Sequence, residues 1–137
     1  MPTGGLSLDE AADAYEATLQ ALYGAPTLRI DRPLFDVTLL GLGDDGHTAS
    51  LFPGDPALGE YVRWAAPVAD AAPEPRVTLT YPALDSSRTV AFLVEGADKR
   101  EVLDAVLSGD ASLPAGRIRP LGEVIWLVDR AAAGRWS

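Results

Sequence analysis

Hydrophobic positions recur along this chain with two different periods, and segments of each kind alternate. Residues 7–23 have the spacing of a helix, in which the capping-box pair Ser7 and Glu10 precedes apolar residues at Ala11, Tyr15, Leu19, Leu22 and Tyr23. Short apolar or alternating runs predict strands over residues 35–40, 61–68, 76–81, 89–94 and 124–128. A helix is predicted between Gly96 and Gly109, and another over residues 129–135. This alternation predicts an α/β domain.

The continuous apolar runs indicate how the strands associate. Runs such as 89–94 are typical of strands buried on both faces of a parallel sheet. We expect strand 35–40 to lie in the interior of such a sheet, with the glycine-rich loop that follows it at the carboxyl end, where ligands of α/β proteins bind. Residues 69–75 are rich in Ala and Pro and predict a linker within a single domain of residues 1–137.

Composition and charge remove several classes of function. The chain has 137 residues, no cysteine, one histidine and a formal net charge of −9. Disulfides, cysteine chemistry and multi-histidine metal sites are therefore excluded. So acidic a chain is a poor general binder of nucleic acid or of anionic membranes. No apolar run approaches the roughly 18 residues of a membrane span, and the first five residues lack the features of a signal peptide, so a cytoplasmic location is expected.

The loop after strand 35–40 contains a literal G-x-G-x-x-G pattern, formed by Gly41, Gly43 and Gly46. That pattern favours a dinucleotide only in the right context. Here Asp44 and Asp45 occupy the turn where a pyrophosphate would have to approach the backbone, and like charge opposes it. A nucleotide-binding module remains one alternative hypothesis for the function of this chain.

The same loop places an imidazole two residues after a carboxylate. His47 is the only histidine, and a histidine can act as a general base near neutral pH. Asp45 can fix its tautomer and stabilise the imidazolium. On residue types alone, a solvated loop histidine beside solvated aspartates is the favoured interpretation.

Residues 35–54, which run through Gly-Leu-Gly-Asp-Asp-Gly-His-Thr-Ala-Ser-Leu-Phe-Pro-Gly, resemble the signature of the 6-phosphogluconolactonase family. Further segments resemble the family in the right order: residues 11–16, 75–80, 89–99, 113–120 and the last strand. Glucosamine-6-phosphate deaminases share this fold and have a similar Asp-Gly-His loop. They carry a catalytic glutamate before the proline, whereas this chain has Leu51 and Phe52 before Pro53.

The resemblance implies hydrolysis of 6-phosphoglucono-δ-lactone to 6-phosphogluconate, in the oxidative pentose phosphate pathway, by a carboxylic ester hydrolase. It implies no metal and no cofactor, and a phosphorylated sugar lactone as the partner. It assigns the general base to His47, its orientation to Asp45, contact with the sugar to Gly41 and Gly43, and the phosphate to Arg76 and Lys99.

The chain resembles only the C-terminal half of that fold, a partial Rossmann-like parallel sheet with flanking helices. The N-terminal half is expected to be absent, and the chain alone is expected to be weakly active or inactive. An uncovered strand edge invites pairing with another chain. We therefore expect self-association or pairing with a missing N-terminal half. The alternative function is a non-catalytic remnant or assembly module of the same fold.

Overall fold

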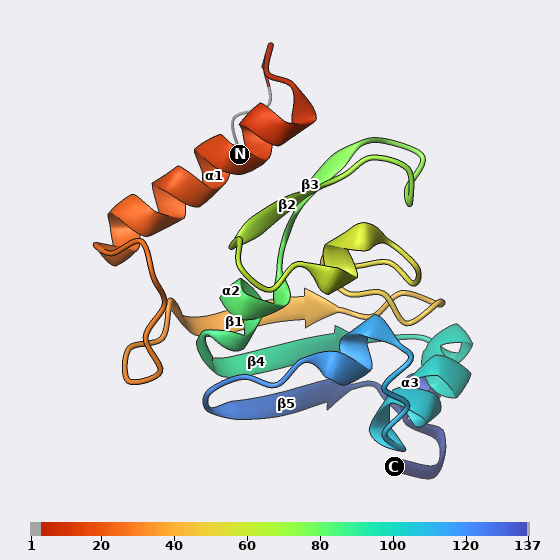
Figure 1. The fold of residues 1–137 in the computed structure, drawn as a ribbon. Coiled ribbons are helices and arrows are strands. Elements are labelled where there is room, and N and C mark those ends of the chain that lie inside the picture. The colour runs from red at the N-terminus through yellow and green to blue at the C-terminus, as the bar shows by residue number, and fades with distance from the viewer. Residues whose placement is uncertain (1–3, 137) are drawn as a thin grey trace.

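The computed structural model describes residues 4–136, and its centre is a parallel sheet of three strands (Figure 1). The strands are β1 (Phe35–Gly41), β4 (Ser87–Val94) and β5 (Glu123–Val128), in the order β1-β4-β5. A separate antiparallel hairpin of β2 (Ala65–Val68) and β3 (Arg76–Leu79) lies beside this sheet. The predicted α/β class with a partial parallel sheet is confirmed.

Helices flank the sheet and the hairpin. The α-helices are α1 (Leu8–Tyr23), α2 (Tyr81–Asp85), α3 (Arg100–Leu107) and α4 (Arg130–Ala133). Short 3-10 helices occupy Pro56–Gly59, Ala97–Lys99, Pro114–Arg117 and Gly134–Trp136. Within residues 4–136 no helix is both long enough and apolar enough to cross a bilayer.

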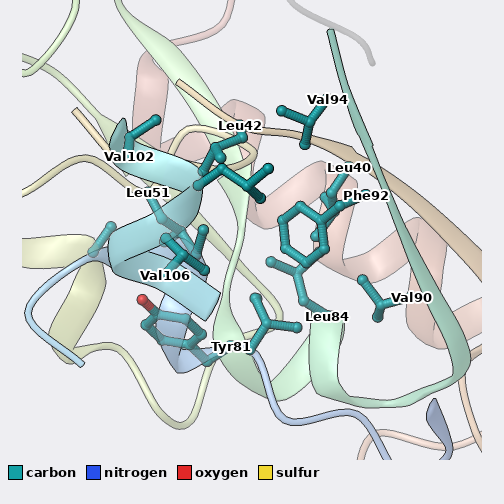
Figure 2. Close-up of a cluster of buried hydrophobic side chains, with 14 of the residues drawn as sticks. Leu40, Leu42, Leu51, Tyr81, Leu84, Val90, Phe92, Val94, Val102 and Val106 are labelled. Atoms are coloured by element: carbon teal, nitrogen blue, oxygen red, sulfur yellow. The ribbon is translucent and has the colours of Figure 1, made fainter. Parts of the chain in front are cut away.

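The main core lies on one face of the three-stranded sheet (Figure 2). Phe92 of the central strand is fully buried, and its ring stacks on Trp126 of β5 with centroids 4.1 Å apart. Helix α3 covers this face because its apolar residues repeat at helical spacing, which buries Val102, Leu103 and Val106. This core holds the carboxyl ends of the strands in place.

Helix α1 packs against the hairpin, away from the main core (Figure 1). Its start is the predicted capping box, in which the Ser7 hydroxyl accepts from Glu10 N–H and the Glu10 carboxylate accepts from Ser7 N–H. Tyr23 meets Trp64 edge to face, with centroids 5.6 Å apart. Leu22, which the helical spacing assigned to the buried face, is instead 80% exposed.

Three predictions about strands are wrong. Strand β1 is not interior: in the part of the chain that the structure describes, it pairs only with β4 and forms an edge. The strand predicted over 61–68 covers only Ala65–Val68, because the N–H groups of residues 62 and 63 donate to the Glu60 side chain, which holds the backbone there in a bend. The strand predicted over 76–81 ends at Leu79, because Tyr81 begins α2 with Pro82 in its first turn, where proline is favoured.

Candidate active site

The glycine-rich loop leaves β1 at its carboxyl end, as the sequence predicted, and folds back on itself. The Gly43 N–H donates to the carbonyl of His47 at 2.8 Å, and the Thr48 hydroxyl donates to the carbonyl of Gly41, also at 2.8 Å. Leu51 is fully buried in the main core, so it anchors the end of the loop. These contacts place His47 above the end of the strand.

His47 and Asp45 form a carboxylate–imidazole pair. Asp45 Oδ1 lies 2.6 Å from His47 Nδ1 and accepts the His47 backbone N–H at 3.0 Å. An ionised carboxylate can only accept hydrogen bonds, so the proton of the neutral imidazole is on Nδ1. The Nε2 atom is then left with its lone pair and can accept a proton.

The electrostatics of Asp45 support an ionised carboxylate. Partial burial opposes its ionisation, but the two hydrogen bonds from His47 outweigh that effect, and the pKa of Asp45 lies below its usual value. Asp45 therefore carries its negative charge at neutral pH, where it orients the ring.

Gly43 makes room for the imidazole. A Cβ atom at this position would lie 2.0 Å from His47 Nδ1 and 2.2 Å from Cε1, closer than any real contact. Gly46 has a φ of +82°, which favours glycine, and its carbonyl accepts the N–H of Ala115 at 2.9 Å. The fold of the loop thus accounts for glycine at two positions of the motif, without a bound nucleotide.

His47 opens onto a pocket of about 420 Å³ that also holds the only lysine of the chain. Lys99 pairs with Asp44 and lies 4.0 Å from the carboxylate of Asp98. The pocket is lined by Leu39, Leu40, Gly41, Leu42, Gly43, His47, Thr48, Ala49 and Lys99. An anion that uses Lys99 competes with Asp44 for its charge.

Arg76, at the start of β3, is linked to the site by a shared contact with Phe52. The Arg76 guanidinium lies over the Phe52 ring, 5.9 Å from its centroid, and the same ring packs against the His47 imidazole at 4.4 Å. The Ser50 N–H donates to Thr78 of the same strand at 3.0 Å, which ties the loop to β3. The structure therefore brings Arg76 and Lys99 to the same end of the sheet as His47.

Two residues of this site were not assigned a role from the sequence. Asp44 is the partner of Lys99, and the Phe52 ring contacts both the imidazole and the guanidinium. Nothing local indicates the contact of Asp44 with Lys99 or of Phe52 with Arg76, since Lys99 and Arg76 come from other segments of the chain. Ala49, which lines the pocket, has a φ of +51°, an uncommon backbone conformation that clusters at functional sites.

The surroundings of the loop do not suit a dinucleotide or a metal ion. Gly46 is followed by turns and by the 3-10 helix Pro56–Gly59, so the loop does not open an α-helix whose N-terminus could hold a pyrophosphate. Within residues 4–136, no cluster of three or more His, Cys, Asp or Glu side chains could hold a metal ion.

Comparisons with known proteins, by family, by sequence and by structure, lead to the same family. Residues 1–126 match the family described as glucosamine-6-phosphate isomerases/6-phosphogluconolactonase. The chain is 42% identical over 135 residues to a 6-phosphogluconolactonase of Synechocystis sp., with 96% of this chain and 55% of the relative covered. It is 40% identical over 133 residues to a human 6-phosphogluconolactonase, with 93% and 50% covered.

The fold agrees with solved structures of the same kind. A 6-phosphogluconolactonase from Thermotoga maritima superimposes with a TM-score of 0.74 at 34% identity, over 90% of this chain and 52% of that one. The chain thus spans about half the length of these relatives and corresponds to their C-terminal half. On the match of residues 1–126, this chain belongs to the glucosamine-6-phosphate isomerase/6-phosphogluconolactonase family.

Proposed function

We propose that this chain carries the catalytic loop of an enzyme that hydrolyses 6-phosphoglucono-δ-lactone to 6-phosphogluconate, with His47 as the general base. The observation that supports it most is the 2.6 Å contact between His47 Nδ1 and Asp45, in a loop that opens onto the pocket with Lys99. The relatives named 6-phosphogluconolactonase support the same reaction class.

The first step uses the free nitrogen of the imidazole. His47 Nε2 takes a proton from a water molecule while the water oxygen attacks the lactone carbonyl carbon, and the carbonyl electrons move to its oxygen. Asp45 stabilises the imidazolium that forms, because its carboxylate accepts the hydrogen bond that Nδ1–H donates.

The second step opens the ring. The tetrahedral intermediate reforms its carbonyl and breaks the bond between that carbon and the ring oxygen. The ring oxygen takes the proton held on Nε2 and becomes a hydroxyl, so His47 returns to its neutral form. The net reaction adds one water to one ester bond, and a lactone is already electrophilic enough to need no metal activation.

The phosphate of the substrate needs local cations because the chain is acidic overall, with a net charge of −9. Arg76 offers a planar fork of donors, and Lys99 offers a mobile point charge. Arg76 and His47 both contact the Phe52 ring, and Lys99 lines the same pocket as His47. This arrangement fits a substrate whose reacting carbonyl and phosphate lie apart.

The proposal is tested with freshly prepared lactone, with spontaneous hydrolysis subtracted. The assays use the 137-residue chain alone and a chimera in which it replaces the matching 135-residue segment of the Synechocystis relative. We expect weak turnover or none from the chain alone and clear turnover from the chimera. A folded chimera with no catalysed hydrolysis contradicts the proposal and favours the non-catalytic module.

Substitution of Asp45 by asparagine in the chimera tests its role as a positioning residue. Charge-assisted hydrogen bonds contribute about 1.5–3 kcal/mol, so kcat is expected to fall about 10- to 100-fold, with KM nearly unchanged. Asp70→Asn, which makes the same charge change in the exposed connection between β2 and β3, is the control. Equal kcat values for the two variants contradict the role of Asp45.

Binding of 6-phosphogluconate to the chain alone tests the two cations. We expect weak binding, around millimolar, measured by calorimetry or NMR titration at low salt. Arg76→Ala and Lys99→Ala should each abolish it, whereas Asp44→Asn should strengthen it by removing the carboxylate that competes for Lys99. Micromolar binding that none of the three variants changes shows that the phosphate lies elsewhere.

A further inference from the structure

One face of the three-stranded sheet is apolar and uncovered in the described chain. We call it the open sheet face and define it by two residues of β1, one of β4 and two of β5. Their exposed fractions are 57% for Val37, 67% for Leu39, 52% for Leu93, 38% for Ile125 and 54% for Leu127. These values are unusual for the central sheet of an α/β fold, since parallel sheets are normally covered on both faces.

The register of the strands makes these side chains neighbours. Leu39 pairs with Ala91 and Ala91 with Ile125, while Leu93 pairs with Leu127 in the next row. Alternation along each strand sends Leu40 and Phe92 to the opposite face, where they are buried in the main core (Figure 2). The open sheet face is therefore a contiguous patch, and patches of this kind mark interaction sites.

The same region has an open strand edge. In residues 4–136, β1 pairs with β4 on one side only, so its other side presents unpaired backbone groups to a further strand. The pocket with His47 begins at this strand, since Leu39, Leu40 and Gly41 line it. Whatever covers β1 therefore also lies beside the pocket.

We infer that the open sheet face and the β1 edge bind a polypeptide with the fold of the N-terminal half of the lactonase relatives, and that this binding closes the pocket. In the Thermotoga maritima structure, the fold of this chain occupies 52% of a longer chain, which leaves a further segment of similar size in that protein. A second copy of this chain is a poorer occupant, because it brings a further net charge of −9 to the interface. The closure of the pocket rests on the proposed function, whereas the binding itself does not.

The test is co-expression of this chain with the N-terminal part of the Synechocystis relative that precedes the match, followed by sedimentation of the purified sample. We expect a 1:1 complex, and slower hydrogen exchange of the β1 amides that face away from β4. Leu39→Asp and Leu127→Asp should each weaken the complex at least tenfold in Kd. Both side chains are largely exposed, so the folded chain tolerates the change, which circular dichroism checks.

Val62→Asp is the matched control, because Val62 is 85% exposed but lies in the connection before β2, outside the sheet. Absence of a complex overturns the inference, as does a complex that Leu39→Asp and Leu127→Asp leave intact. A dimer of this chain that excludes the added half overturns it as well. Because the readout is association, a complex without lactone turnover contradicts only the proposed function.

Discussion

Replacement of His47 by alanine is expected to lower lactone turnover on the order of 10²–10⁴-fold, the range for a positioned general base. The reason is that His47 is the only histidine of the chain and that its Nε2, within residues 4–136, is left to take a proton at the pocket, while Nδ1 is engaged by Asp45. The measurement is kcat in the chimera with the Synechocystis half, with spontaneous hydrolysis subtracted.

Rescue by added imidazole distinguishes two effects of the His47 substitution, the loss of the base and damage to the loop. If the loop of the His47→Ala variant keeps its shape, free imidazole should enter the space left by the ring and restore part of the turnover. Catalysed turnover close to that of the parent chimera removes His47 from the mechanism. The variant should keep its stability, since the His47 side chain is about one-third exposed and contributes little to the core.

Substitution of Gly43 by alanine is expected to lower turnover by at least about 10²-fold, although it changes no group that reacts. The added Cβ atom would lie 2.0 Å from His47 Nδ1, so the ring must leave its place and lose its contact with Asp45. The measurement combines kcat with the NMR signals of the imidazole, which report its separation from the carboxylate.

Gly59→Ala is the control for the Gly43 variant. A Cβ atom at Gly59 meets nothing within 4 Å, and the residue lies in the 3-10 helix Pro56–Gly59, away from the pocket. We expect it to keep parental turnover. If Gly43→Ala retains turnover as well, the placement of His47 in this structure is wrong for the active enzyme.

The elements that the sequence predicted well are those whose stabilising contacts are local. The start of α1 depends on Ser7 and Glu10, three residues apart, and its end on Gly24, which has a φ of +79°. The Asp45–His47 pair spans two residues. Gly109, with a φ of +93°, follows α3 where the pattern placed it. Such contacts follow from spacing alone, so they can be read without the rest of the fold.

Periodicity was misleading where a local pattern has two structural outcomes. The run 76–81 alternates as a strand does, but Pro82 favours the first turn of a helix and ends the strand at Leu79. Strand β1 is apolar enough to be interior, yet Val37 and Leu39 are exposed and its edge is unpaired within residues 4–136. An apolar run indicates that a surface can be buried, and it does not specify which segment buries it.

The amino-acid sequence alone thus determined the α/β class, the glycine-rich loop at the end of β1 and the paired carboxylate and imidazole within that loop. Only the tertiary structure decided that Lys99 meets Asp44, 55 residues away, and that the Arg76 guanidinium lies over the Phe52 ring. It also decided which face of the sheet is left open. These contacts join distant segments, so they depend on strand order and on the packing of the core, and no local spacing encodes them.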